Sequence, residues 1–243
     1  MKAIVINNPV GPKGLMLKEL DDPVPGPDDI VVDVKATALN RADLAQTNGN
    51  YPAPVGSPSE IPGLEMAGVV LDKGQHVTGL ETGDRVFGLL GGGGYASRVV
   101  LNHRLAVPIP DRLDYVQAAG CPEVFFTAYD ALFNHCQLKM GERVLIHAAG
   151  SGVGTAAIQL SKIRKAGKIF GTASDSKHEF LKENGVIPIS YSENFVDSIK
   201  KQTDGKGVQI ALDPVGGKNL MQSYKSLSSG GRVFTYGISS MAQ

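Results

Sequence analysis

The sequence is poor in the residues that build disulfide frameworks and metal clusters. Its 243 residues include no tryptophan and only two cysteines, Cys121 and Cys136. One isolated pair fits neither a disulfide framework nor a zinc-binding spacing. We therefore interpret both cysteines as small buried hydrophobic side chains. The scarcity of cysteine favours a reducing, cytoplasmic setting.

Long apolar runs and a strong charge of one sign are also missing. No apolar run approaches the ~20 residues that cross a bilayer, and residues 1–6 predict a first strand instead of a signal peptide. Residues 1–120 carry 10 basic and 14 acidic side chains, whereas residues 121–243 carry 14 and 10, which gives −4 and +4. We therefore expect no membrane partner, and neither half is basic enough for nucleic-acid binding to be the main role.

The most informative stretch is a glycine turn between an apolar run and a helical pattern. Val144–Ile146 predicts a buried strand, Gly150, Gly152 and Gly154 form the turn, and apolar residues then recur at helical spacing. Strand, glycine turn and helix open a dinucleotide-binding unit, in which the first free helical N–H groups bind a pyrophosphate. The G-x-G-x-G spacing departs from the strict fingerprint, so a tight structural turn remains the alternative.

The first 110 residues read as β-rich. Short strands are expected at 3–6, 15–20, from 32, 66–71, 85–89, 96–100 and 105–108. Between them, Gly91–Gly94 predicts either close backbone approach to a ligand or a flexible hairpin tip. Residues 114–140 turn helical, with Pro122 as an interruption.

From residue 143 onward, strands and helices alternate. Strands are expected at 143–147, 168–172, 186–189, 208–213 and 232–236, with helices to about 165, from 176, over 193–201 and over 218–227. Ser176 and Glu179 form a capping-box pattern, and Gly185 ends that helix. Five parallel strands are one fewer than a full doubly wound dinucleotide sheet contains, so we expect this α/β domain to be truncated after its fifth strand.

Several segments together resemble the medium-chain dehydrogenase/reductase superfamily. They are 38–43 (ALNRAD), 62–70 (PGLEMAGVV), 83–86 (GDRV) and 144–159. The match resembles most the zinc-free, zeta-crystallin-like quinone oxidoreductases. The runs at 40–43 and 50–52, with Pro122-Glu123 before Phe126-Thr127-Ala128, look like the branch that contains the tumour-suppressor-inducible quinone oxidoreductase.

The resemblance implies a GroES-like catalytic domain over 1–120, a Rossmann NADP-binding domain over 121–243, and an active site in the cleft between them. In that family a sixth strand follows, the sheet edge forms a homodimer, and the chain returns to complete the first domain. Because this sequence stops at Gln243, both domains are expected to be incomplete.

Catalytic zinc is not expected. Zinc-dependent relatives carry a cysteine at the position of Asn40 and a histidine at that of Leu64, whereas Glu65 alone cannot make a site. The five histidines show no ligand spacing, and no cysteine precedes residue 121. Without zinc, the task that fits is hydride transfer from a reduced nicotinamide to an acceptor that is already electrophilic, such as a quinone or an activated enone.

The resemblance places Asn40 and Tyr51 beside the nicotinamide and the acceptor. We expect both to bind the acceptor oxygen, with Tyr51 assisting protonation. The alternatives are a cap or turn residue for Asn40 and a loop aromatic for Tyr51. An enoyl-thioester reductase, or a cofactor-binding chain without catalysis, remains an alternative function.

The second parallel strand indicates NADPH. NAD-specific sites carry an acid at the strand tip, where the alignment places Ala173, whereas Ser174 and Lys177 suit a 2′-phosphate, joined by Tyr191 on the resemblance. Asp175 would oppose that phosphate if it turned inward, and helix capping is the alternative role for Ser174. The remaining residues expected beside the cofactor, by turn chemistry and resemblance, are Thr127, Gly150, Ser151, Gly152, Val153, Gly154, Asp213, Val215 and Gly237.

Overall fold

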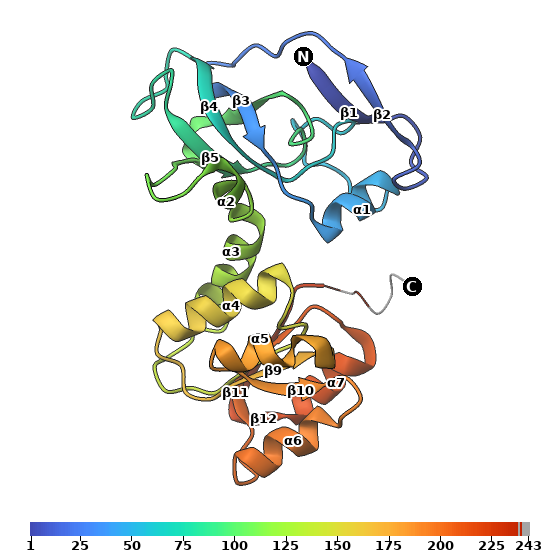
Figure 1. The fold of residues 1–243 in the computed structure, drawn as a ribbon, viewed down its shortest axis with the longest axis vertical. Coiled ribbons are helices and arrows are strands. Elements are labelled where there is room, and N and C mark those ends of the chain that lie inside the picture. The colour runs from blue at the N-terminus through green and yellow to red at the C-terminus, as the bar shows by residue number, and fades with distance from the viewer. Residues whose placement is uncertain (238, 240–243) are drawn as a thin grey trace. The chain divides into compact units, whose positions relative to one another are not determined.

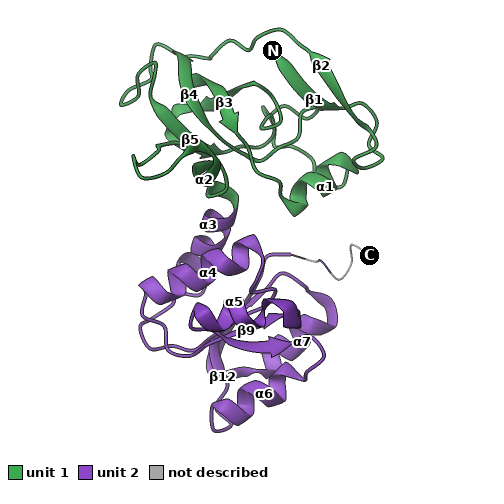
Figure 2. Cartoon of the chain, viewed as in Figure 1, with its two compact units in different colours: residues 1–123 green, residues 124–243 purple. Residues whose placement is uncertain are grey.

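The computed structural model describes residues 1–237 and 239. The chain divides into two compact units, Met1–Glu123 and Val124–Gln243 (Figure 2). Each unit has its own hydrophobic clusters and is described by itself. No helix among the described residues is both long enough and apolar enough to cross a membrane.

Unit 1 is built on a five-stranded antiparallel sheet in the order β6-β3-β4-β5-β7 (Figure 1). Its strands are β3 (Asp29–Ala36), β4 (Glu65–Lys73), β5 (Arg85–Leu89), β6 (Arg98–Asn102) and β7 (Ala106–Pro108). Val32 pairs with Val70 across β3 and β4, and both side chains are fully buried. Burial of such alternating apolar residues stabilises one face of the sheet.

A separate hairpin and two short helices complete unit 1. β1 (Lys2–Ile6) pairs with β2 (Leu15–Glu19), and the helices are α1 (Arg41–Thr47) and α2 (Tyr115–Ala119). The strand pattern of the sequence is thus confirmed. Helix α1 was not expected, because its seven residues carry too few apolar positions to show a helical period.

The four-glycine loop over 91–94 is packed closely against the protein's own chain. A Cβ on Gly92 would lie 2.5 Å from the Pro58 carbonyl oxygen, and one on Gly94 would lie 2.8 Å from the Glu65 carbonyl oxygen. Gly92 to Gly94 are buried, so the loop is not a flexible hairpin tip. These glycines permit close backbone approach, but to the protein's own chain.

Unit 2 is a five-stranded parallel sheet in the order β10-β9-β8-β11-β12, which is the order of a dinucleotide-binding sheet. Its strands are β8 (Val144–Ile146), β9 (Ile169–Ala173), β10 (Ile187–Ser190), β11 (Val208–Asp213) and β12 (Leu227–Thr235). Its helices are α3 (Pro122–Tyr129, which begins at the end of unit 1), α4 (Gly152–Ile163), α5 (His178–Glu183), α6 (Phe195–Gln202) and α7 (Gly217–Lys225).

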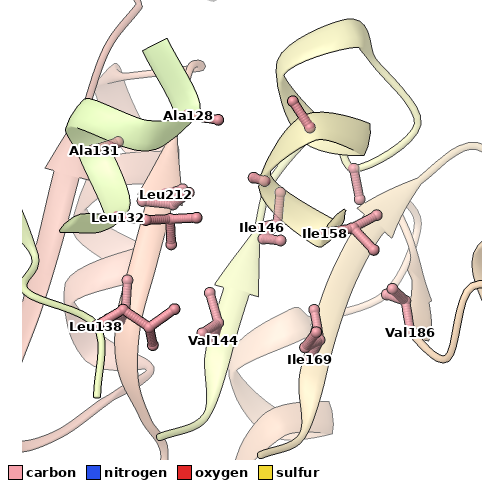
Figure 3. Packing of buried hydrophobic residues seen from close by; sticks show 14 of the residues in the cluster. Ala128, Ala131, Leu132, Leu138, Val144, Ile146, Ile158, Ile169, Val186 and Leu212 are labelled. Carbon is pink, nitrogen blue, oxygen red and sulfur yellow. The ribbon is translucent and has the colours of Figure 1, made fainter. Parts of the chain in front are cut away.

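Two hydrophobic clusters hold this sheet. One contains Leu132, Ile146, Ile158 and Leu212, and Figure 3 shows these side chains facing one another from the strands, α4 and the segment after α3. The other contains Leu145, Phe170, Ile189 and Ile199. Alternate residues of β8 thus enter different clusters, which is why this strand reads as a continuous apolar run.

The helical stretch is interrupted at Pro122 as predicted: α2 ends at Ala119, and Pro122 begins α3, where its fixed φ and missing N–H are tolerated. One local expectation is corrected. The capping box at 176–179 is wrong: α5 begins at His178, after a short turn over 175–177, and the Ser176 hydroxyl lies 3.1 Å from that of Ser174. Gly185 ends α5 as predicted, with φ of +73°.

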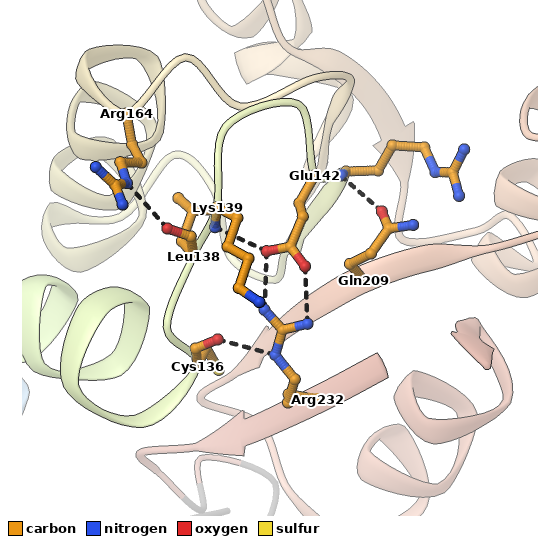
Figure 4. A network of polar contacts seen from close by, with 8 residues as sticks. Cys136, Leu138, Lys139, Glu142, Arg164, Gln209 and Arg232 are labelled. Atoms are coloured by element: carbon orange, nitrogen blue, oxygen red, sulfur yellow. Dashed lines mark hydrogen bonds and ion pairs between the residues drawn. The ribbon is translucent and has the colours of Figure 1, made fainter. Parts of the chain in front are cut away.

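An ion pair ties β12 to the segment before β8. The two terminal nitrogens of Arg232 donate to the two carboxylate oxygens of Glu142, at 2.9 and 2.8 Å (Figure 4). Arg232 Nε also donates to the Cys136 carbonyl oxygen at 2.8 Å. A bidentate pair with a third bond fixes the guanidinium in one position.

Candidate functional site

The glycine turn lies between β8 and α4, as predicted. Ser151 is the N-cap of α4, and its hydroxyl accepts the Gly154 N–H at 3.1 Å. Ala148 has φ of +50°, a left-handed conformation that usually selects glycine. This is the region where the sequence carries alanine in place of the first glycine of the fingerprint.

The positions of the turn are glycine for different reasons. A Cβ on Gly154 would lie 2.5 Å from the Ala148 carbonyl oxygen and 2.6 Å from that of Ala149. Gly154 is therefore required for α4 to pack on its own turn. A Cβ on Gly152 would instead meet the Val124 side chain at 2.8 Å. The first helical N–H groups, at Gly152 and Val153, have no carbonyl one turn earlier in α4, which suits an anion.

Lys177 reaches back to this turn from the end of β9. Its Nζ donates to the Gly150 carbonyl oxygen at 2.8 Å, and its Cδ fills the space where a Gly150 side chain would lie. Ser174 is exposed nearby in sequence, while the Asp175 side chain is 79% exposed and lies 3.7 Å from His178 Nε2. Lys177 therefore places a cation at the turn, whereas Asp175 is directed to solvent and His178.

Tyr191 follows β10, and its side chain is exposed. Because β8, β9 and β10 are neighbouring parallel strands, their carboxyl ends lie at one edge of the sheet. The predicted residues of these three segments are thus brought to the edge at which ligands bind in open α/β sheets.

Asp213 ends β11 and organises the turn that follows it. Its Oδ1 accepts the N–H groups of Val215 and Gly216, at 2.7 and 2.9 Å. Burial alone would raise the pKa of this carboxyl, but these bonds and one from Ser223 outweigh it and leave the pKa below its ordinary value. Asp213 is therefore an ionised structural cap.

Gly237 and Thr127 complete the predicted set in unit 2. A Cβ on Gly237 would lie 2.7 Å from the Pro214 carbonyl oxygen, so this glycine packs against the turn after β11. Thr127 is half-buried on α3. Gly237 and the turn that follows Asp213 thus pack against each other.

In unit 1, Asn40 is the N-cap of α1, and its side chain is held by a buried acid. Its N–H donates to Asp43 Oδ2 at 2.7 Å, and its Nδ2 donates to Glu65 Oε1 at 2.6 Å. The other Glu65 oxygen accepts the Glu123 N–H at 3.0 Å. The amide of Asn40 is therefore oriented, and its second side-chain N–H has no hydrogen-bond acceptor among the described residues.

Glu65 is almost wholly enclosed, with 1% of its surface exposed. This burial raises the pKa of its carboxyl, against the opposing effect of the hydrogen bonds from Glu123 and Asn40. Tyr95 was missed by the sequence analysis: its hydroxyl donates to Asp43 Oδ2 at 2.7 Å. The signal was weak, since Tyr95 simply follows the glycine loop. Burial beside these acids raises the pKa of the Tyr95 hydroxyl.

Tyr51 lies four residues beyond the end of α1, with 47% of its surface exposed. Its hydroxyl has no protein partner among the described residues. Asn40 and Tyr51 therefore flank the two ends of the same short helix, Asn40 held firmly and Tyr51 open to solvent.

No zinc site is formed where zinc-dependent relatives have one. Leu64 is buried and apolar, and the polar atoms of Asn40 and Glu65 bind each other. Over residues 1–237 and 239, no cluster of three or more histidine, cysteine or acidic side chains is arranged to hold a metal ion.

Two family models match this chain. Residues 26–111 match the alcohol dehydrogenase GroES-like domain, and residues 152–243 match the model described as zinc-binding dehydrogenase. The sequence is 40% identical over 225 residues to the synaptic vesicle membrane protein VAT-1 homolog of Rattus norvegicus, covering 90% of this chain and 54% of that protein. The chain therefore spans about half the length of that curated relative.

Two further proteins are matched over a larger share of their own length. The quinone oxidoreductase of Rattus norvegicus is 33% identical over 242 residues, which cover 98% of this chain and 73% of that protein. The crystal structure of CurK enoyl reductase superposes with a TM-score of 0.91 at 30% identity, covering 97% of this chain and 74% of that one. With the GroES-like sheet, the parallel sheet and the glycine turn, these matches show that the chain belongs to the medium-chain dehydrogenase/reductase superfamily of oxidoreductases, which bind a nicotinamide cofactor.

Proposed function

We propose that this chain belongs to a zinc-independent reductase that transfers a hydride from NADPH to a quinone or an activated enone, within the zeta-crystallin-like branch. The observation that carries the proposal is Lys177, whose Nζ lies 2.8 Å from the Gly150 carbonyl oxygen. A cation at the glycine turn, and the apolar Ala173 at the tip of β9, favour a 2′-phosphate over a free 2′-hydroxyl.

The residues present fit the cofactor. The N-terminus of α4 offers free N–H groups for the pyrophosphate, and small residues keep the turn clear of side chains. Lys177, Ser174 and Tyr191 would hold the 2′-phosphate, and the backbone at Val215 and Gly237 would flank the nicotinamide half. Once bound, the reduced nicotinamide supplies the hydride.

The acceptor needs a hydrogen-bond donor and a proton. The remaining Asn40 N–H would bind the acceptor oxygen, and Glu65 holds that amide in one orientation. Tyr51 would donate a proton, so that a quinone receiving one hydride and one proton becomes a hydroquinone. Tyr51 would then regain its proton from solvent.

A second candidate is an enoyl-thioester reductase, in which the hydride reaches the β-carbon of a conjugated thioester. The similarity to CurK enoyl reductase favours it. A third candidate is a chain that binds the cofactor without turnover.

The test is NADPH oxidation by the purified chain with an ortho-quinone, an enone or a crotonyl thioester. Acceptor-dependent oxidation with the quinone or the enone supports the proposal. Turnover of the thioester alone favours the second candidate, and NADPH binding without turnover favours the third. Binding of neither NADPH nor NADH overturns all three.

Two variants test the acceptor residues. Asn40→Ala and Tyr51→Phe should each lower kcat/KM for the quinone by roughly 10²-fold, the size of one lost acid–base or hydrogen-bond contribution. Asn134→Ala and Tyr129→Phe are matched controls, because both side chains are polar groups of α3 and its continuation at the surface. Unchanged quinone turnover in both site variants would remove them from the mechanism.

The resemblance also predicts a homodimer. β12 lies at one edge of the parallel sheet, where unpaired backbone groups can accept a further strand. We propose a homodimer through this edge, to be measured by sedimentation equilibrium. The low cysteine content is what supports a reducing, cytoplasmic compartment.

A further inference from the structure

A chain of buried hydrogen bonds runs through the parallel sheet of unit 2 and centres on His147. This residue follows β8 and is 2% exposed. Its Nδ1 lies 3.0 Å from Thr172 Oγ1 on β9, and its Nε2 lies 2.9 Å from Ser223 Oγ on α7. The proposed mechanism does not use this histidine.

The direction in which these hydrogen bonds donate follows from the contacts of Ser223. Its hydroxyl lies 2.8 Å from Asp213 Oδ2 and 3.0 Å from the Asn219 carbonyl oxygen. Both neighbours can only accept, so the single hydroxyl proton cannot point at His147. The ionised carboxylate is the stronger and nearer acceptor and takes that proton. His147 must therefore donate through Nε2–H to the Ser223 oxygen.

The role of the other ring nitrogen, Nδ1, is then also determined. Burial lowers the pKa of His147 to about 4, so the ring is neutral near pH 7 and carries a single N–H. With that proton on Nε2, Nδ1 accepts the hydroxyl proton of Thr172. The Thr172 oxygen in turn accepts the Ala148 N–H at 3.3 Å. Ala148 is the residue of the glycine turn with φ of +50°.

This series of hydrogen bonds ends at the turn after β11. Asp213 accepts from Ser223 through Oδ2 and from the N–H groups of Val215 and Gly216 through Oδ1. The hydrogen bonds thus begin at Ala148, in the turn after β8, and end at Gly216, in the turn after β11. β8 and β11 are adjacent strands.

We propose that neutral His147, as the Nε2–H tautomer, is a positioning residue that couples these two turns, so that the backbone of both sides of the nucleotide site is held as one unit. The inference rests on the proposed function for the identity of the ligand. It gives a physical reason why a buried imidazole directly precedes the glycine turn. A histidine that merely fills space would have no defined tautomer and would transmit nothing between the turns.

The first experiment measures the tautomer in the ligand-free chain, by ¹H–¹⁵N multiple-bond correlation spectra of ¹⁵N-labelled protein at pH 7. The expected spectrum of His147 is that of a neutral ring protonated at Nε2. A ring protonated at Nδ1, or a charged imidazolium, would overturn the proposal. This measurement is independent of which cofactor binds.

The second experiment asks whether the turns are coupled. Thr172→Val breaks the chain at the first link and leaves the 213–217 turn untouched. We expect amide hydrogen exchange at Gly216 to accelerate roughly 10-fold, as local opening becomes easier. Thr172→Ser, which keeps the hydroxyl, should restore slow exchange. Ser161→Ala is the matched control, because Ser161 of the same unit is fully buried and its hydroxyl has no hydrogen-bond partner among residues 1–237 and 239. Exchange at Gly216 that is unchanged in Thr172→Val would contradict coupling.

The third experiment is a double-mutant cycle on the NADPH dissociation constant. Thr172→Val and Ser223→Ala should each weaken binding about 10-fold, and the double variant no further, because both cut the same chain. Independent effects that multiply to roughly 100-fold would contradict the proposal. If the unmodified chain binds no nicotinamide nucleotide, the proposed function fails, while the tautomer and exchange measurements still decide whether His147 couples the turns.

Discussion

The ammonium of Lys177 donates a hydrogen bond to the Gly150 carbonyl oxygen at 2.8 Å and thereby joins two segments that are 27 residues apart in the sequence. Its Cδ occupies the volume that a Gly150 side chain would need. The residue expected to select the cofactor thus lies against the turn expected to bind its phosphates. Four predictions follow the contacts of this unit.

Lys177→Ala should weaken NADPH binding about 10-fold and leave NADH binding nearly unchanged. A phosphate that loses one cationic partner loses on the order of 1.4 kcal/mol, or one factor of ten. Isothermal titration with both nucleotides measures the ratio. Lys182→Ala is the control, since Lys182 is an exposed cation of α5 with only a 3.8 Å contact to Glu179. A Lys177→Ala chain that kept its full preference for NADPH would contradict the assignment.

Gly154→Ala and Gly150→Ala should differ sharply. At Gly154 the added methyl group meets two backbone carbonyls, at 2.5 and 2.6 Å, which cannot move without unwinding the start of α4. We expect loss of several kcal/mol of unfolding free energy, on the order of an overpacked core. At Gly150 it meets only the flexible Lys177 side chain. That variant should remain folded in urea denaturation and lose NADPH affinity. Equal stability of the two variants would show that the turn is looser than its contacts indicate.

Arg232→Met should lower the free energy of unfolding by about 1–3 kcal/mol at pH 7, because it leaves the Glu142 carboxylate without its bidentate partner. Burial by itself raises the pKa of Glu142, but the hydrogen bonds from Arg232 and from the Lys139 N–H outweigh it and depress the pKa. A depressed carboxyl pKa stabilises the fold above the unfolded value of about 4.3 and loses this contribution as the pH falls through the folded value.

The difference between wild type and Arg232→Met, measured by urea denaturation, should therefore shrink below about pH 4. Glu179→Gln removes an exposed carboxylate of the same unit and should show no such dependence. A pH-independent difference for Arg232→Met would mean that packing of the arginine stem, and not its charge, sets the stability.

His147 should make the fold sensitive to mild acid. Its pKa is about 4 in the folded state, mainly through burial, against about 6.5 when unfolded. Between these two pH values the unfolded chain binds more protons than the folded one. The contribution of neutral His147 to the free energy of unfolding is therefore fully present above pH 6.5. It falls as the pH drops toward 4, by at most about 3 kcal/mol. Chemical denaturation at several pH values measures the slope. His147→Gln should flatten it, and a slope that persists unchanged in this variant would assign the acid sensitivity to other groups.

Local pattern was sufficient for most elements. β11 was predicted at its observed bounds because Val208–Asp213 is mostly apolar, with Gln209 as the one polar residue before the terminal Asp213, as expected of a strand buried on both faces. α1 was missed because a seven-residue helix can be held by its caps and contacts instead of an amphipathic face. The capping box at 176 failed because Ser174 and Ser176 bond each other, which the residue pattern alone cannot distinguish from a cap.

For the candidate site, the sequence singles out the glycine turn, Lys177 and Asp213, because ligand chemistry at strand ends restricts residue type. The hydrogen-bond partners of the site residues could not be predicted from the sequence. The pairing of Asn40 with Glu65 spans 25 residues, and the link from Asp43 to Tyr95 spans 52. No local pattern encodes partners at such separations.

The sequence by itself determined the two kinds of sheet, the turn between β8 and α4, and the absence of the zinc-ligand residues at Asn40 and Leu64. These depend on side-chain type and on periodicities of two to four residues. Only the tertiary structure decided that Gly91–Gly94 serves internal packing, that Asp175 faces away while Lys177 covers the glycine turn, and that His147 is bonded at both ring nitrogens. The physical reason is that burial and hydrogen-bond partners arise when distant segments pack, and the direction of each proton then follows from which neighbours can only accept.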